Sequence, residues 1–212
     1  TAMNLREKES RRVADALRNT GLKVNSIFDL VTSRSSYKEA IPVLIELLPT
    51  ISDNWIKEGV VRALTVKEAV GEDVSRAMIR EFEAISPSAP PSEQALKWAI
   101  ANTLSVVARD SVFEKVAALA RDKQHGKARE MLAVALGNMK DLRAIDVLVV
   151  LLNDDEVAGH ALIALGKLKA VKAKPAIKRF LDHPKPWVRK EAERALKKIE
   201  KAKLAKLGSE SN

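Results

Sequence analysis

The sequence contains no cysteine among its 212 residues, which excludes disulfide bonds, thiolate metal sites and thiol catalysis. Aromatic residues make up only 4%, so a core must be built from alanine, leucine, valine and isoleucine. Eight glycines and eight prolines are few for an all-β chain of this length. No apolar run reaches the roughly 18 residues of a membrane span, and the charged N-terminal segment lacks the apolar stretch of a signal peptide. We therefore expect a helical, cytoplasmic protein.

Positive charge is unevenly distributed along the chain. The formal net charge is +9, and residues 151–212 alone contain 15 basic and 8 acidic side chains. A basic C-terminal region can attract nucleic acid, anionic lipid or an acidic protein. The alternative is a lysine-rich helix whose charges only keep the protein in solution.

One pattern recurs five times and predicts pairs of helices. In each copy a leucine lies late in the second helix, with apolar residues 8 and 4 positions before it and alanine or threonine one position before it. These offsets fall on one face of an α-helix. The spacing between successive leucines ranges from 29 to 40 residues, which is typical of helical repeats. The five anchors are Leu64, Leu104, Leu136, Leu165 and Leu196.

Each second helix follows another amphipathic helix, so the pattern predicts an all-α, right-handed α-solenoid of about six antiparallel helix pairs. We interpret residues 1–212 as one domain. Residues 4–36 would form N-terminal capping helices, residues 37–200 five repeats, and residues 201–212 a lysine-rich extension. The Pro/Ser-rich segment 86–92 is interpreted as a long surface loop, with a domain boundary as the alternative.

Two segments carry a family resemblance. Residues 144–166, with Asp154-Asp155 between their two apolar stretches, and residues 174–196 resemble the short HEAT-like repeats of the phycobilisome-lyase type. The resemblance extends over roughly residues 37–200 and implies the fold rather than a function. It also implies a structural ladder at the position after each −8 residue, interrupted by Ala158. The predicted ladder residues are Lys57, Lys97, Arg129 and Arg189, with Asp182 as the partner of Arg189.

Enzymes that share this architecture leave no clear signature in the chain. Deoxyhypusine hydroxylases bind iron through His-Glu pairs, but no histidine here is followed by glutamate. HEAT-like DNA glycosylases use tryptophan with a carboxylate one turn later, whereas Trp98 is followed by Asn102 and Trp55 by Gly59. Phycobilin lyases offer no compact motif to test. We therefore predict no enzyme, no catalytic residue, no metal and no cofactor.

A binding surface can be predicted from the helix geometry. If offsets −8, −4, −1 and 0 face the core, offsets −6, −2 and +1 point away from it. These outward positions include an apolar strip formed with Gly137, Gly159 and Gly166, and burial of that strip between repeats is the alternative. The predicted partner-binding residues on the concave face are Arg62, Trp98, Asn102, Val134, Ile163, Lys190, Arg194 and Lys197.

The function predicted from the sequence is that of a protein-binding or scaffold module. A groove with apolar anchors and a basic end suits a protein segment with an acidic end, and Trp98 is the expected hot spot. The alternative is a nucleic-acid-binding HEAT solenoid, similar in architecture to the DNA glycosylases, that uses its basic C-terminal repeats. The sequence leaves the oligomeric state open.

Overall fold

The computed structural model describes the backbone of residues 4–210 and the side chains of residues 4–205. Every regular element in the described range is helical, and no strand occurs there, so the predicted all-α class is confirmed. No helix in that range is long and apolar enough to cross a membrane. The chain forms two compact units, Thr1–Ala108 (unit 1) and Arg109–Asn212 (unit 2). The predicted single-domain organisation stays a prediction.

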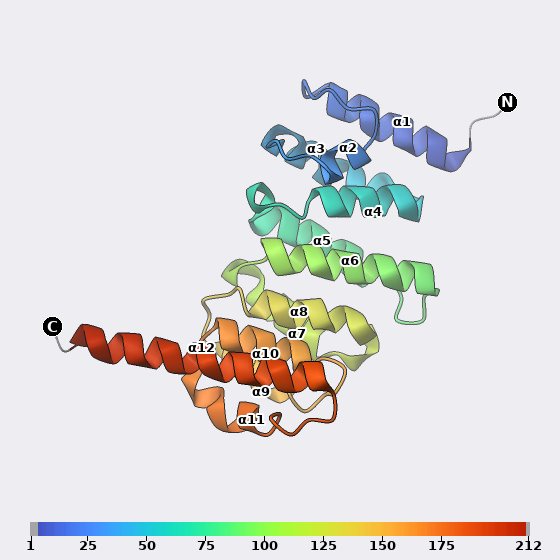
Figure 1. Cartoon of the computed structure of the whole chain (residues 1–212). Coiled ribbons are helices and arrows are strands. Elements are labelled where there is room, and N and C mark those ends of the chain that lie inside the picture. Colours follow the sequence, from blue (N-terminus) through green and yellow to red (C-terminus); the bar gives the residue numbers. More distant parts are fainter. Residues whose placement is uncertain (1–3, 211–212) are drawn as a thin grey trace. The chain divides into compact units, whose positions relative to one another are not determined.

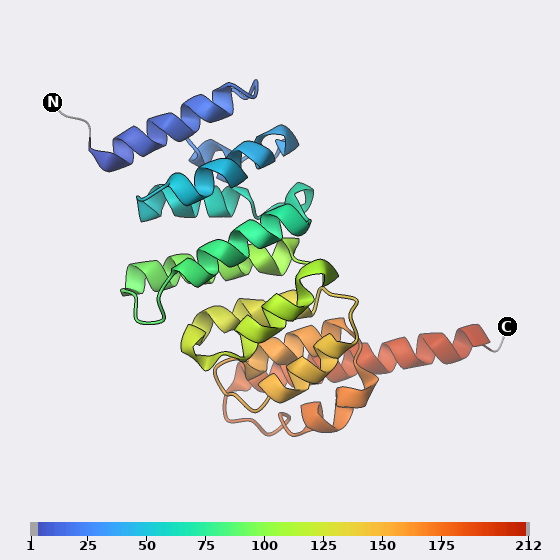
Figure 2. The ribbon, with the colours of Figure 1, turned by 180° about the vertical axis from the view of Figure 1, so that it is seen from behind.

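Unit 1 consists of stacked helices in two layers. Figure 1 shows α1, α4 and α6 in one layer, and the reverse view in Figure 2 brings α3 and α5 to the front. The α-helices are α1 (Leu5–Arg18), α2 (Phe28–Val31), α3 (Ile41–Leu47), α4 (Asn54–Ala63), α5 (Glu72–Ala84) and α6 (Pro91–Val107). Short 3₁₀ turns are η1 (Lys38–Ala40), η2 (Leu48–Thr50) and η3 (Lys67–Ala69).

Unit 2 repeats this arrangement, with α8, α10 and α12 packed side by side. Its α-helices are α7 (Phe113–Arg121), α8 (Arg129–Leu136), α9 (Arg143–Leu151), α10 (Ala158–Lys167), α11 (Lys174–Lys178) and α12 (Pro186–Glu210). Its 3₁₀ turns are η4 (Asp110–Val112), η5 (Lys123–Ala128) and η6 (Val171–Ala173). The predicted lysine-rich extension is thus a helical continuation of α12 as far as Glu210, and the last two residues lie outside the described range.

The core of both units follows the repeat pattern. Leu64, Leu104, Leu136 and Leu165 are fully buried between the two layers of helices. Leu196 is only half-buried, and the next core position of α12 is instead Ile199, which has no exposed surface. No following helix pair covers α12 within the described residues, and its anchor leucine is therefore less enclosed than the other four.

Neighbouring second helices meet through a regular side contact. The residue after one anchor touches the residue before the next: the hydroxyl oxygens of Thr65 and Thr103 lie 2.8 Å apart. In unit 2 the same position is glycine, and a Cβ atom at Gly137 would lie 2.8 Å from the Cα atom of Ala164. Gly166 meets the Cα atom of Ala195 at the same distance. The +1 positions in these contacts therefore lie between helices, and their predicted outward orientation is wrong.

The Pro/Ser-rich loop joins α5 to α6 inside unit 1. The side-chain amide of Gln94 donates to the carbonyl oxygens of Ser86 and Pro87, both at 3.0 Å. The boundary between the two compact units instead follows α6, at Ala108. This loop is therefore an internal connection within one unit.

Candidate functional site

A groove of about 950 Å³ opens between α1, α2 and α4 in unit 1. One face of α1 forms its first wall, because residues three or four apart on a helix share a face. The second wall comes from α2 and the start of α4. The lining residues are Asn4, Arg6, Glu7, Ser10, Arg11, Ala14, Arg18, Asn25, Phe28, Trp55 and Ile56.

An aromatic pair provides the apolar part of this groove. The ring centroids of Phe28 and Trp55 lie 5.3 Å apart in a tilted arrangement. Gly59 allows α2 to approach α4, because a Cβ atom there would lie 2.8 Å from Ile27 Cγ2 and 3.1 Å from the Phe28 ring. Trp55 is still 53% exposed, so an apolar group could gain considerable contact by packing on it. Trp55 thus packs on the chain segment that precedes its own helix.

Three arginines surround the aromatic pair. Arg6 Nε lies 3.1 Å from Asp53 Oδ2. Arg18 donates a hydrogen bond of 2.9 Å to the carbonyl oxygen of Val24 and forms an ion pair with Asp15. Arg11 is exposed and forms no ion pair with any other described residue. Glu7 is the one acidic residue of the lining, and its carboxylate accepts a hydrogen bond from the Asn4 amide in a capping box. The groove therefore has a positive rim with one unneutralised guanidinium.

A buried carboxylate joins α1 to the start of α4. Glu9 is 6% exposed and accepts hydrogen bonds from the backbone amides of Ser52 at 2.9 Å and Asp53 at 2.8 Å. The side chain of Asp53 in turn accepts from the amides of Trp55 and Ile56 and caps α4. The wall that carries the arginines is thus fixed against the helix that carries Trp55.

The predicted surface residues of unit 1 lie on α4 and α6. Arg62 is exposed and pairs with Glu58 one turn earlier. Trp98 is 39% exposed, and Asn102 is half-buried one turn further along α6. None of the three lines the groove of α1 and α4.

In unit 2 the predicted residues divide into two groups. Val134 and Ile163 are half-buried, whereas Lys190, Arg194 and Lys197 are exposed on α12. The glycines that were expected to widen the strip are covered by the next helix, Gly137 and Gly166 by alanines and Gly159 by the ring of Trp187. The apolar strip is consequently narrower than predicted.

Lys57 and Lys97, two of the predicted ladder residues, connect neighbouring elements of unit 1. Lys57 Nζ lies 2.7 Å from Glu81 Oε2 on α5, and both side chains are largely buried. Lys97 has no exposed surface, donates 2.7 Å to the carbonyl oxygen of Ile85, and lies 4.8 Å from the centre of the Phe82 ring. Their contacts are those of structural residues.

Arg129 forms the corresponding connection in unit 2. Its side chain is 2% exposed, and its Nη2 atom lies 3.0 Å from Asp154 Oδ2 and 2.9 Å from Glu156 Oε2. Burial acts to raise the pKa of Asp154, but the Glu156 amide and the Arg129 guanidinium hold that pKa below its usual value. This cluster links α8 to the turn before α10.

Arg189 differs from the other ladder residues, and its predicted ion pair with Asp182 is wrong. No such pair forms among the described residues. The guanidinium instead donates to the carbonyl oxygens of His183, at 2.7 Å, and Pro184, at 3.2 Å. Asp182 is exposed in the turn before α12. Arg189 therefore closes the loop at the start of its own helix rather than bridging two repeats.

His160 lies on α10 and is half-buried. It packs edge-on against Trp187, with ring centroids 5.7 Å apart. Burial lowers the pKa of His160, while the charges of Glu130 and Glu191 act in the opposite direction. Within the described residues no group of three or more His, Asp or Glu side chains is arranged to hold a metal ion. His160 is therefore a packed side chain, and the two glutamates partly offset the effect of burial on its pKa.

The groove between α1 and α4 was not found by sequence reasoning. The repeat pattern assigned residues 4–36 to N-terminal capping helices, and it left the space between α1 and α4 undefined. The sequence carries one signal for it, since Glu7, Arg11 and Arg18 share one polar face of α1.

Comparisons with known proteins agree with the repeat architecture. A sequence profile described as HEAT repeats matches residues 150–207, and one described as PBS lyase HEAT-like repeat matches residues 128–154. No curated protein matches the chain. The solved structure of an engineered protein, Northeast Structural Genomics Consortium target OR329, is similar with a TM-score of 0.53 and 19% identity, covering 95% of this chain and 93% of that one.

A designed armadillo repeat protein, YIII(Dq)4CqI, is also similar, with a TM-score of 0.48, 15% identity, and coverage of 94% of this chain and 96% of that one. At 19% identity, the likeness to the engineered protein bears on the fold alone. Together with the repeat profiles, it confirms the predicted fold class and resemblance. The protein is an all-helical repeat protein that carries HEAT-like repeats.

Proposed function

We propose that the protein is a non-catalytic binding module and that the groove between α1 and α4 holds a short segment of a protein partner. The observation that carries the proposal is the combination of an aromatic pair, with Trp55 exposed and Phe28 half-buried, and an arginine rim in one groove of about 950 Å³. Repeat proteins commonly bind partners through surfaces of this kind.

The chemistry of the groove favours an acidic segment with an apolar anchor. A guanidinium can form two parallel hydrogen bonds with a carboxylate, and Arg11 has no other described charge to satisfy it. An aromatic or leucine side chain would pack on Phe28 and Trp55. The 14 residues of α1 span roughly 21 Å, enough for about six extended residues of a partner.

The partner-binding residues predicted from the sequence could extend this surface. Arg62 lies on α4 together with Trp55, and Trp98 and Asn102 lie on the neighbouring α6. A partner that continues past the groove along α4 would meet them next. In unit 2, Val134, Ile163 and Lys190 keep their proposed role as a separate contact surface for a protein, and Arg194 and Lys197 remain candidates for contact with a second partner.

A peptide selection tests the groove. A displayed library of random eight-residue peptides, selected on the full chain, should yield sequences with acidic residues around one aromatic or leucine residue. Arg11→Glu should weaken binding of a selected peptide at least tenfold, since hot-spot contacts are worth roughly 1.4 kcal/mol or more. Fluorescence anisotropy with the labelled peptide measures the change.

The matched control is Arg80→Glu. Arg80 is exposed on α5 and forms no ion pair with another described residue, so the variant makes the same change in net charge outside the groove. The peptide should bind this variant as it binds the unmodified protein. Equal losses in both variants, or no loss in Arg11→Glu, would contradict the proposed site.

A further inference from the structure

The second unit has a basic groove of its own, between the end of α10 and the second half of α12. It has a volume of about 470 Å³ and is lined by Gly166, Lys167, Lys169, Lys198, Lys201, Ala202 and Ala205. A neighbouring hollow of about 440 Å³ shares Lys198 and Lys201 and adds Glu191, Arg194 and Lys197. Six cationic side chains and one acidic side chain therefore line these two adjoining hollows, which together are called the track.

Most of these charges are not neutralised by the protein. Lys197, Lys198 and Lys201 form no ion pair with another described residue, whereas elsewhere in the unit Lys172 pairs with Asp146 and Lys174 with Glu200. The one acidic residue, Glu191, is itself paired with Arg194. The track consequently keeps a concentrated positive potential.

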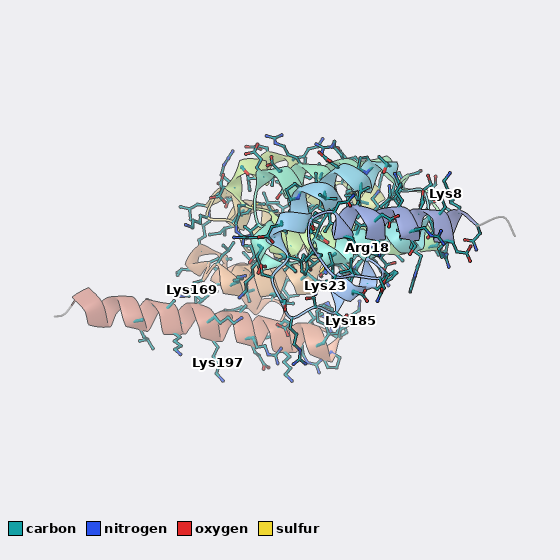
Figure 3. The ribbon with its side chains drawn as sticks, turned by 90° about the horizontal axis from the view of Figure 1, so that it is seen from above. Lys8, Arg18, Lys23, Lys169, Lys185 and Lys197 are labelled. Carbon is teal, nitrogen blue, oxygen red and sulfur yellow. The ribbon has the colours of Figure 1, made fainter. Side chains whose placement is uncertain are left out.

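The positions of the lysines come from the length of α12. This helix has 25 residues, against 10 in α10, and it continues past the end of its neighbour in Figure 1. Among its described side chains, Ile199 is the last fully buried one, and Lys201 is exposed beyond it. In Figure 3, Lys197 points away from the body of unit 2, and Lys169 lies on the other side of α12.

Lys169 is held in an unusual backbone conformation. Its φ angle is 52°, the single positive value for a non-glycine residue in the described chain. It closes α10 in a Schellman motif, in which the Ala170 amide donates to Leu165 O at 3.1 Å and the Lys169 amide to Gly166 O at 3.2 Å. Glycine usually occupies this position because it adopts a positive φ angle without strain. Lysine at this position therefore lowers the stability of the fold.

We propose that this track binds the phosphate backbone of a nucleic acid duplex without reading its sequence. Lysines are flexible point charges that suit phosphates. Among the described residues that line the track, none is an aromatic on which the bases of a single strand could stack, and its glycine and alanine residues offer no pocket for a peptide anchor. The proposed site lies in the other unit and is independent of the protein-binding groove.

Fluorescence anisotropy on the full chain tests the proposal, with a labelled 20-base-pair DNA duplex, an RNA duplex and a single strand of equal length. Both duplexes should bind more tightly than the single strand. If four lysines of the track each contact one phosphate, the slope of log K against log salt should be about −3.6. The binding constant should then fall roughly 100-fold between 50 and 200 mM salt. A slope near zero, or tighter binding of the single strand, would overturn the proposal.

Two substitutions locate the site. Lys198→Ser with Lys201→Ser should weaken duplex binding about tenfold and reduce the salt slope by about 1.8. The matched control, Arg121→Ser with Lys178→Ser, removes the same charge from exposed positions on α7 and α11 and should bind as the unmodified protein. Equal binding by both double variants would overturn the proposal. So would displacement of the duplex by poly-glutamate at equal charge concentration, which would assign the track to acidic proteins.

Lys169→Gly separates the structural from the binding role of the rim. The substitution removes the unfavourable φ angle, so the urea midpoint should rise, while the loss of one phosphate contact should reduce the salt slope by about 0.9. A rise in stability with unchanged duplex binding would remove Lys169 from the site. A fall in stability would contradict the explanation given for its conformation.

Discussion

Arg129→Met should destabilise unit 2 by about 3 kcal/mol, since removing one partner of a buried ion pair leaves the other charges uncompensated. Arg129 is 2% exposed, and Asp154 beside it is 17% exposed. Methionine retains most of the apolar packing of the arginine stem, so the change isolates the charge. Urea unfolding followed by circular dichroism measures the effect.

The pH dependence of this loss identifies its origin. The folded-state pKa of Asp154 is lowered, so its contribution to stability is present above its unfolded value of about 3.9 and disappears as the pH falls through the folded value. The difference in the free energy of unfolding between Arg129→Met and the unmodified protein should therefore become smaller as the pH is lowered. Lys172→Met, which breaks an exposed pair with Asp146, should change stability by less than about 1 kcal/mol. A similar loss in both variants would contradict a special role for the buried cluster.

Gly166→Val should destabilise unit 2 by about 3 kcal/mol, because α10 and α12 touch at this glycine. A Cβ atom at Gly166 would lie 2.8 Å from the Cα atom of Ala195, and backbone cannot move aside without separating the helices. Any gain from replacing glycine in a helix is about 1 kcal/mol at most and would not offset the clash. The urea midpoint measures the change.

Gly159→Val is the matched comparison on the same helix. Its new Cβ atom would meet the ring of Trp187 at 1.9 Å, but this side chain is 46% exposed and can swing outward. We therefore expect a smaller loss of stability than in Gly166→Val, accompanied by a red shift of tryptophan fluorescence. The reverse order of the two losses would contradict the assignment of Gly166 to a backbone contact.

The helices were predictable because their periodicity is strong. The anchor leucines and the residues 8 and 4 positions before them define one helix face, and Leu64, Leu104, Leu136 and Leu165 are buried as that pattern requires. The outward face was predicted less well. A second helix touches its neighbours on both flanks as well as the layer behind it, so the arc that faces solvent is narrower than a helical wheel suggests. Gly137 and Gly166 lie on one of these flanks.

Long-range partners account for what the sequence could not define. The burial of Arg129 was unpredictable in detail because Asp154 and Glu156 belong to the next repeat, more than 20 residues away. The expected pairing of Arg189 with Asp182 failed because nearby carbonyl groups satisfy the guanidinium first. The groove between α1 and α4 depends on the approach of Phe28 to Trp55, which no local pattern specifies.

The protein-binding groove is tested most directly by the indole signals of the three tryptophans in a proton–nitrogen NMR spectrum. Trp55 lies in the groove, whereas Trp98 and Trp187 lie on α6 and α12. On titration with a selected acidic peptide, the signals of the Trp55 indole and of the α1 amides should shift. The indole signals of Trp98 and Trp187 should keep their positions in the spectrum. Saturable binding that shifts Trp98 or Trp187 and leaves Trp55 unchanged would contradict the proposed site.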